Sequence, residues 1–451
     1  GQFGVSLANS IATIHGSVLS GHPFAAIDAQ NSTLTLTSSE LLDNEDYGLR
    51  MVNSTANVSD TRISGALGSE DGDDYSGSCV FSEDSSAPIV MENVQIDSCA
   101  RVAVYWFYSD FEVSGSSLSN ANYGFVGVGG GGDGTVLTDN HLQDMAYYGI
   151  YVIEQDSSII GNTVTASNAV FQDSIGIAVG NSDGNFTVED NTVEGYRLYS
   201  IWVQYPYDPA PEGGTAVVSG NTVRDGQMYG LYVSALDEVT FTDNVVDTLA
   251  WSGTQSVPNS YSSGMGIGLF DIGELTMSGN AAIDVDVVGY FIQNTEFTST
   301  DDEVTGTRMW AMYIDQSSGT FTGLDVHDLN IYGIDARVSD VDFEGCTFRD
   351  LHEGIQPADE GDPGAYPYST MGIVYNDAQG TVAGASFSNI EYYGVYVQEG
   401  SVTVDGNSFD DNYTGVYIYS STMAEGYPVY VENNTFGEHT YTAINAYTSD
   451  A

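Results

Sequence analysis

Residues 148–164 read YGIYVIEQDSSIIGNTV, and looser copies of this stretch recur along the chain, as in YGLYVSALDEVTFTDNVV at 229–246. Apolar residues alternate with a period of two, as at Ile150 and Val152, and return in the closing segment at Val164. β-branched and aromatic residues dominate these segments, and patterns with the 3.6-residue period of a helix are missing. The stretch therefore predicts three short strands in each copy and no helix.

The copies recur at a regular spacing. Aligned on the Asn of the GNTV string, Asn162, they give 17 positions and 16 intervals, of which eight equal 22 residues and none is shorter. The longer intervals contain polar insertions. Three short strands every 22 residues predict a β-solenoid of about 17 coils, each adding about 4.8 Å along the stack. Residues 1–451 are therefore expected to form a single domain.

The aligned position itself calls for a physical explanation, because Asn occupies eight of the 17 copies. We expect this residue to adopt a positive φ in the turn between the second and third strands, which Asn tolerates better than most residues. Stacked Asn side chains should also hydrogen-bond to one another from coil to coil. Glycines that open the first strand, such as Gly149 and Gly394, are explained in a similar way by backbone conformation.

These repeats resemble those of the right-handed parallel β-helix proteins of the pectin-lyase-like superfamily, over essentially the whole chain. The resemblance implies an all-β, right-handed parallel β-helix with three short strands in each coil and loop insertions between them. It does not imply one function, because the superfamily includes lyases, hydrolases, epimerases, phage tailspikes and adhesins. It does imply that a bound polysaccharide would follow the face formed by the first strand of each coil, which the insertions flank.

Composition excludes several classes of partner. The chain carries 63 acidic residues and 8 basic ones, giving a formal charge of -55. No basic stripe is available to neutralise nucleic-acid phosphates or anionic lipids. No apolar run reaches the roughly 18 residues that would span a bilayer. The self-repulsion of so much negative charge predicts a dependence on salt or bound cations.

The outward position of the first strand carries a stripe of aromatic residues. Flat rings on an exposed ladder could stack on sugars or on a partner protein, whereas the competing interpretation is cross-strand stacking that stabilises the sheet. The stripe includes Tyr105, Tyr151, Trp202, Tyr232, Phe291, Tyr313, Tyr396 and Tyr417.

The sequence contains few short motifs typical of catalytic sites. Asp350-Leu351-His352-Glu353 is similar to the Asp-Pro-His-Asp/Glu string of mannuronan epimerases, with Leu351 in place of Pro. Asp350, His352 and Glu353 are therefore the candidate proton-transfer residues, although a lone surface His is the competing interpretation. The Gly-His-Gly and Arg-x-Lys strings of polygalacturonase-like hydrolases are missing. Arg50 and Arg337 are expected to face outward from the first strand, in no recognisable lyase motif.

Two acidic insertions, EDGDD at 70–74 and ADEGD at 358–362, are candidate calcium sites, because Ca²⁺ prefers six to eight oxygen ligands. Solvated loops with diffuse counterions are the alternative. The candidate ligands are Asp71, Asp73, Asp74, Asp359, Glu360 and Asp362.

Cysteine placement bears on the compartment. Cys79 and Cys99 fall in neighbouring coils within reach of a disulfide, which would fit a location outside the cytoplasm. Cys346 takes the place of an aligned Asn and is expected to be a small buried residue rather than a reactive thiol.

The first and last strands are expected at 3–7 and 443–447, with no capping helix at either end. Open end coils are sheet edges, so copies are expected to associate end to end. The sequence thus predicts a non-enzymatic structural protein, extracellular or at the cell surface, either a filament subunit or an adhesin-like rod. A polysaccharide-active enzyme or glycan-binding β-helix is the first alternative. A segment of a larger surface protein is the second.

Overall fold

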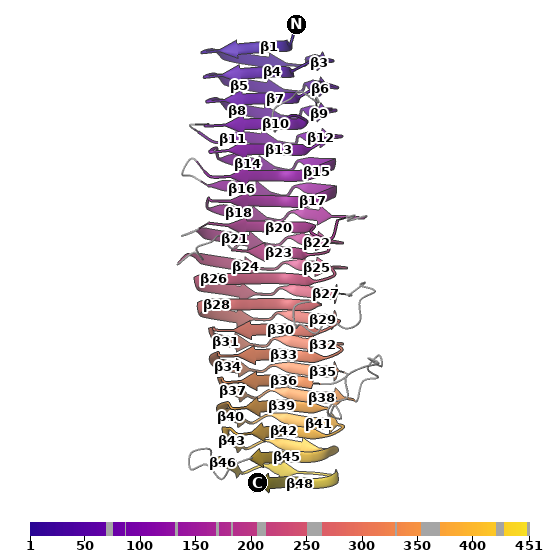
Figure 1. Cartoon of the computed structure of the whole chain (residues 1–451), viewed down its shortest axis with the longest axis vertical. Helices are drawn as coiled ribbons and strands as arrows, with labels where there is room; N and C mark the ends of the chain where they lie inside the picture. The colour runs from indigo at the N-terminus through magenta and orange to yellow at the C-terminus, as the bar shows by residue number, and fades with distance from the viewer. Residues whose placement is uncertain are drawn as a thin grey trace. The chain divides into compact units, whose positions relative to one another are not determined.

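A computed structural model describes residues 1–68, 75–85, 87–130, 134–167, 171–181, 184–204, 213–249, 264–329, 332–352, 370–420 and 428–448. The described residues form 48 strands and no helix, and strands of successive coils pair in parallel (Figure 1). None of the described segments is a helix able to cross a membrane. The all-β parallel solenoid predicted from the repeat is confirmed.

The chain divides into two compact units, residues 1–226 and 227–451. The strands of the first unit are β1 Phe3–Ala8, β2 Ile11–His15, β3 Val18–Ser20, β4 Ala25–Gln30, β5 Thr33–Thr37, β6 Glu40–Leu42, β7 Tyr47–Val52, β8 Thr55–Ser59, β9 Arg62–Ser64, β10 Ser78–Glu83, β11 Ile89–Glu92, β12 Gln95–Asp97, β13 Val102–Phe107, β14 Phe111–Ser114, β15 Ser117–Val128, β16 Thr135–Thr138, β17 His141–Ile153, β18 Ser157–Ile160, β19 Thr163–Thr165, β20 Ile175–Gly180, β21 Asn185–Glu189, β22 Thr192–Glu194, β23 Tyr199–Val203, β24 Thr215–Ser219 and β25 Thr222–Arg224.

The second unit repeats the same plan. Its strands are β26 Tyr229–Thr242, β27 Val245–Leu249, β28 Met265–Ser278, β29 Ala281–Val285, β30 Val288–Gln293, β31 Glu296–Thr300, β32 Glu303–Thr305, β33 Trp310–Asp315, β34 Ser318–Thr322, β35 Asp325–Leu329, β36 Tyr332–Arg337, β37 Asp340–Glu344, β38 Thr347–Leu351, β39 Met371–Asn376, β40 Gln379–Ala383, β41 Ser386–Ile390, β42 Tyr393–Gln398, β43 Ser401–Asp405, β44 Ser408–Asp410, β45 Asn412–Ser420, β46 Val429–Glu432, β47 Thr435–Phe436 and β48 His439–Thr448.

Alternating apolar residues of each strand point into the solenoid and stack on the same residue of the next coil. In the first unit Ile27 pairs with Leu49, and Leu49 pairs with Val80, all fully buried. Each buried side chain is worth about 1.5–3 kcal/mol relative to its exposed state. The period-two pattern of the sequence therefore forms one continuous core within each unit.

The turn between the second and third strands differs from the prediction by one residue. The positive φ belongs to the residue before the aligned Asn: Asp139 has φ 54° before Asn140, and Gly161 has φ 67° before Asn162. The predicted positive φ of the Asn was therefore wrong. The reason is that the preceding residue makes the bend, which turns the Asn side chain inward, where it is fully buried.

The predicted hydrogen-bonded ladder of Asn side chains is confirmed. Asn140 N and Nδ2 both donate to Asn162 Oδ1 at 3.0 Å, and Asn162 N and Nδ2 donate to Asn191 Oδ1 at 2.9 and 3.1 Å. Asn162 Nδ2 also donates to the Leu137 carbonyl at 2.8 Å. The side chain thus satisfies backbone groups in a turn that the sheet ladder does not reach.

Over four successive coils of the first unit, aspartate and glycine alternate at the positive-φ position of this turn, in the order Asp139, Gly161, Asp190 and Gly220. A Cβ at the equivalent Gly279 of the second unit would lie only 2.6 Å from Asp243 Oδ1, so the carboxylate occupies the space above the glycine. Carboxylates consequently recur every second coil, about 9.6 Å apart, which lowers the repulsion between like charges.

Glycines that open the first strand are required by close packing rather than by φ. Gly149 and Gly394 are not in the positive-φ region. A Cβ on Gly149 would lie 2.6 Å from the Gly176 carbonyl oxygen, and one on Gly394 would lie 2.7 Å from that of Gly415. The explanation by backbone conformation was therefore wrong for these glycines, which allow coils to approach one another.

Cys79 and Cys99 form a disulfide, with 5.6 Å between their Cα atoms. Cys346 is free and buried, and burial raises its thiol pKa to about 11. Its Sγ lies 3.6 Å from the Phe321 carbonyl oxygen, as an aligned Asn would place its amide. Cys346 is therefore a small core residue in its neutral form.

Asp302 occupies an aligned Asn position in the second unit and is almost fully buried. Its Oδ1 accepts hydrogen bonds from Asn280 N at 2.7 Å and Asn280 Nδ2 at 2.9 Å, and its Oδ2 accepts one from Ser299 Oγ. Burial raises the pKa of Asp302 above its ordinary value of 3.8, against these hydrogen bonds. A charged carboxylate is therefore held in the core at neutral pH at a cost in stability.

We expect Asp302→Asn to raise the melting temperature at pH 7 by about 2–4 °C, because the amide preserves the shape without the charge. Because the folded-state pKa is raised, the wild-type carboxyl loses stabilisation as the pH rises from 3.8 through that pKa. The gain should therefore vanish below pH 3.8. Asp60→Asn, an exposed residue before the aligned position of a coil in the first unit with the same charge change, is the control in calorimetry across pH; equal gains in the two variants would contradict the prediction.

Candidate functional site

The outward side chains of the first strands form one register column in each unit, which we call the first-strand face. In the first unit Phe81 pairs with Tyr105, Tyr105 with Val126, and Val126 with Tyr151; the column continues through Ala178 to Trp202. In the second unit the column is Tyr232, Gly268, Phe291, Tyr313, Asp335, Val374, Tyr396 and Tyr417. Each aromatic residue of the predicted stripe occupies this column in its unit.

Burial divides the stripe into two kinds of residue. Trp202, Phe291 and Tyr313 are 9%, 8% and 7% exposed, so neighbouring side chains cover them. Phe291 and Tyr313 belong to an apolar cluster that also contains Met265 and Val288. These residues stabilise the sheet by packing, which leaves the partly exposed tyrosines as the accessible rings.

Phe270 joins the face although it is not in the column. Its ring lies 4.9 Å from that of Tyr232 and 5.0 Å from that of Phe291, and Phe291 stacks on Tyr313 at 4.9 Å. The column residue of this coil is Gly268, and the Phe270 ring fills the space beside it. The sequence alignment missed Phe270 because it considers only the residue in register.

Each unit places one arginine against the rings. The Arg337 guanidinium carbon lies 5.1 Å from the Tyr313 ring centroid, and Arg337 Nε and Nη2 donate to Asp335 Oδ2 at 3.0 and 2.7 Å. Arg50 Nη1 donates to the buried Asp28 at 2.8 Å, with the Phe24 and Phe81 rings at 5.7 and 5.9 Å.

Both arginines therefore face outward, as expected, and both are bound to a carboxylate. An ion-paired guanidinium does not release its proton, so neither arginine is suited to act as a base. Burial raises the pKa of Asp335, while the Arg337 charge opposes the rise. The pair and its aromatic neighbours are suited to binding rather than to proton transfer.

Tyr396 and Tyr417 are partly exposed residues of the face whose rings are parallel and stack on each other. Their ring centroids are 5.4 Å apart with an interplanar angle of 6°, and Tyr393 lies 4.7 Å from Tyr417. Burial, with further contributions from neighbouring tyrosines, raises the pKa of Tyr396 to about 12. The rings are therefore neutral phenols at physiological pH, and the stacked pair presents ring edges and hydroxyl groups.

The candidate proton-transfer residues lie away from this face, at the end of the third strand β38. The Asp350 carboxylate accepts a hydrogen bond from Asn389 Nδ2 at 2.7 Å and lies 3.9 Å from Arg349 Nη1. His352 is exposed, and its backbone N donates to the Leu329 carbonyl at 3.0 Å. Glu353 lies outside the described residues. Asp350 therefore interacts with neighbouring side chains, and it does not lie on the first-strand face.

The predicted calcium ligands Asp71, Asp73, Asp74, Asp359, Glu360 and Asp362 all lie outside the described residues. Among the residues that the structure does describe, no group of three or more His, Cys, Asp or Glu side chains is placed to hold a metal ion.

Several solved structures match the structure of this chain at low sequence identity. The tailspike gp42 of Acinetobacter phage vb_AbaP_AS12 is 13% identical with a TM-score of 0.33, over 80% of this chain and 58% of the tailspike. The alginate lyase AlyF-OU02, solved with G6, is 11% identical with a TM-score of 0.30, over 83% of this chain and 82% of the lyase. Similarities of this size carry no information on activity, and the chain spans little more than half of the tailspike.

No curated protein matches the chain in sequence. The family described as the right handed beta helix region matches residues 1–118, 104–261 and 310–451, which together include most of the chain. The register of parallel strands, the buried Asn ladder and this match lead to one conclusion. The chain belongs to the right-handed β-helix family.

Proposed function

We propose that this chain is a non-enzymatic extracellular β-helix of the adhesin type, which binds neutral polysaccharide through the first-strand face around Tyr396 and Tyr417. The observation that carries the proposal is the parallel, partly exposed pair of tyrosine rings. Parallel stacked rings at the spacing of the coils offer an extended chain a repeated series of apolar ring edges, and their hydroxyls offer hydrogen bonds.

The negative charge of the protein favours a neutral polysaccharide over an anionic one. A chain with a formal charge of -55 repels uronate or sulfate polymers, and the outward arginines Arg50 and Arg337 are already bound to Asp28 and Asp335. A neutral glycan meets no such barrier. The disulfide between Cys79 and Cys99 supports a location outside the cytoplasm.

A binding role is favoured over catalysis by the placement of the titratable groups. General acid–base catalysis needs a proton donor and a proton acceptor within hydrogen-bond reach of the same substrate atoms. Asp350 is bound to Asn389, and His352 lies beside the third strand rather than on the aromatic face. We therefore expect the purified protein to leave alginate, pectate and polygalacturonate unchanged. Turnover that disappears in His352→Ala would overturn the proposal.

Replacing Tyr396 and Tyr417 together with Ala should weaken binding to a neutral polysaccharide by about 10- to 100-fold, since buried aromatic anchors dominate such contacts. Retardation in native gels containing dextran, mannan or xylan measures the effect. Tyr108→Ala removes an exposed tyrosine from the first unit and is the control. An equal loss in the control, or binding unaffected by the double variant, would exclude this face.

End-to-end association remains a prediction. β1 pairs with β4, and β48 pairs with β45, with Val5 and Ile444 in the inward columns of these strands. Lysine at Val5 and Ile444 would put charge into such a junction, and sedimentation velocity would show whether the unmodified protein forms assemblies that this double variant does not.

A further inference from the structure

A groove of about 840 Å³ follows the corner between the first and second strands of the second unit, and neither Tyr396 nor Tyr417 lines it. It extends from Ile272 to Ser401 over six successive coils, about 24 Å at the spacing of stacked strands. Its volume falls within the range of about 300–1,000 Å³ that is usual for ligand sites.

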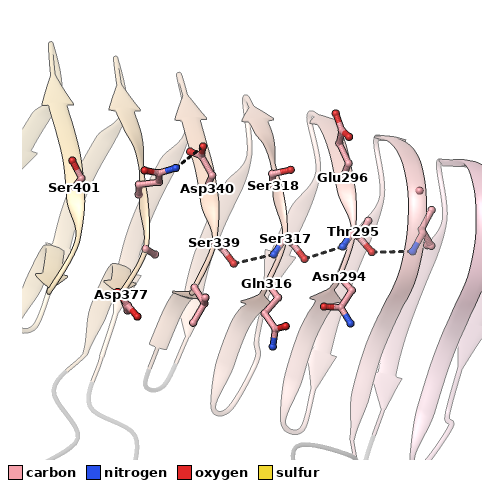
Figure 2. Close-up of a pocket in the computed structure, with 15 residues that line it drawn as sticks. Asn294, Thr295, Glu296, Gln316, Ser317, Ser318, Ser339, Asp340, Asp377 and Ser401 are labelled. Atoms are coloured by element: carbon pink, nitrogen blue, oxygen red, sulfur yellow. Dashed lines mark hydrogen bonds between the residues drawn. The ribbon is translucent and has the colours of Figure 1, made fainter. Parts of the chain in front are cut away.

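The floor of the groove consists of small buried residues in register, Thr295, Ser317, Ser339 and Ala378 (Figure 2). Thr295 N donates to Ser317 Oγ, and Ser317 N donates to Ser339 Oγ, both at 3.2 Å. The hydroxyls in turn donate to carbonyl groups two residues earlier in the chain. The floor is therefore rigid, and its polar groups are already satisfied.

Two rims rise from this floor, and Figure 2 shows their side chains on opposite sides of it. Each floor residue is preceded by an exposed residue with φ near 50° and followed by the first residue of the second strand. The first rim is Asn294, Gln316, Val338 and Asp377, and the second rim is Glu296, Ser318, Asp340, Gln379 and Ser401. Four successive corners of equal length keep the groove straight.

The rims supply mainly hydrogen-bond acceptors. Glu296, Asp340 and Asp377 contribute carboxylates, while the Gln379 amide donates to Asp340 Oδ2 at 2.9 Å. The lining contains no Arg, Lys or His, so an anionic ligand has no partner here. A neutral ligand rich in hydroxyl groups can donate hydrogen bonds to these acceptors and has no negative charge that needs a cationic partner.

A cation is a poorer fit than a hydroxyl-rich ligand. Glu296 and Asp340 lie in one register column with Ser318 between them, about 9.6 Å apart by strand spacing. Calcium ligands must all lie within about 2.6 Å of the ion. These two carboxylates are therefore too far apart to share one.

Val338 adds an apolar contact to the polar rims. It is 59% exposed and has φ 48°, an unusual conformation for a β-branched residue. Such a conformation persists only where the surrounding structure enforces it. An exposed apolar side chain between amides and carboxylates suits a ligand that has both hydroxyl groups and C–H surfaces.

We infer that this corner groove is a second binding site, independent of the tyrosine face, for an extended neutral glycan chain. The glycan would lie along the stack of coils, with its hydroxyls on the two rims and the C–H face of one sugar on Val338. The inference does not depend on the proposed role of Tyr396 and Tyr417.

The test compares two matched double variants. Glu296→Ala with Gln379→Ala removes one carboxylate and one amide from the second rim; Glu112→Ala with Gln143→Ala removes the same groups from exposed strand positions of the first unit. Both pairs of changes are made in the Tyr396→Ala/Tyr417→Ala background, so that the tyrosine face does not contribute. In native gels containing dextran, mannan or xylan, the groove changes should weaken the remaining binding about 10- to 100-fold, and the control changes should leave it unaltered. Equal weakening, or binding to polygalacturonate alone, would overturn the inference. A complete absence of binding in that background would also overturn the inference.

Val338→Asn provides a second measurement in the intact protein. Asn tolerates a positive φ better than Val, so the variant should melt at the same or a higher temperature, while glycan binding measured in the Tyr396→Ala/Tyr417→Ala background falls several-fold. Unchanged glycan binding in both this variant and the Glu296/Gln379 variant would overturn the groove but leave the tyrosine site standing. Binding lost only in the groove variants would overturn the tyrosine site instead. A wild type that binds none of the three polysaccharides would overturn both.

Discussion

Asn162→Ala should lower the free energy of unfolding by about 3–5 kcal/mol, measured by urea denaturation at high salt. The side chain accepts from Asn140 N and Asn140 Nδ2 and donates to the Leu137 carbonyl at 2.8 Å, all in the buried core. Alanine would take the side-chain acceptor from Asn140 N and one of the two hydrogen bonds from Asn140 Nδ2, which would keep its bond to the Val113 carbonyl, and would remove the donor to Leu137, at about 1–3 kcal/mol for each buried group left unsatisfied. The loss exceeds that of an ordinary surface change because the groups affected are buried.

Two further variants make the result specific. Asn122→Ala removes an exposed amide that bonds to the Ala100 carbonyl at 3.3 Å and should cost under about 0.5 kcal/mol. Asn162→Ser should recover part of the loss, because Ser116 occupies the same turn position and its Oγ accepts from Val94 N at 3.0 Å. If Asn162→Ala cost no more than Asn122→Ala, the ladder would not be a source of stability.

Lowering the ionic strength should reduce the melting temperature by more than about 10 °C, because the formal charge of -55 is then poorly screened. The Asp–Gly alternation at Asp139, Gly161, Asp190 and Gly220 shows that the fold already separates neighbouring carboxylates. Their spacing of about 9.6 Å is close to the Debye length at 0.1 M salt, so screening acts directly on these pairs.

Calorimetry from 10 mM to 1 M KCl measures this effect, and a chelator added at constant ionic strength separates general screening from bound calcium. A further fall with chelator, reversed by Ca²⁺ and lost when Asp71, Asp73 and Asp74 are changed to Asn, would support the predicted calcium site. A melting temperature insensitive to both treatments would contradict the salt dependence and the calcium prediction together.

The strands and their order could be predicted because the relevant signal is local. Period-two apolar residues such as Ile150 and Val152 bury one face of a strand wherever it lies, and the 22-residue interval aligns successive coils. The same alignment placed the aromatic column and the Asn ladder. It placed the positive φ one residue too late, because sequence spacing does not distinguish the residue that bends from the residue that turns inward.

Accessibility and concavity could not be predicted in this way. The aligned sequence treats Tyr313 and Tyr396 alike, yet Tyr313 packs in an apolar cluster while Tyr396 is partly exposed. Phe270 fills the space beside Gly268 from a neighbouring position. These outcomes depend on the volumes of side chains from different coils.

The sequence by itself determined the parallel β-solenoid and its repeat, because these follow from periodicity, and its composition is the basis of the predicted dependence on screening of negative charge. Only the tertiary structure decided which rings are accessible, that Arg50 and Arg337 are held by carboxylates, and that small residues at Thr295, Ser317 and Ser339 form the floor of a groove. The physical reason is that a surface is formed by side chains from coils 22 or more residues apart, whose burial and pairing are set by packing between coils rather than by the pattern within one coil.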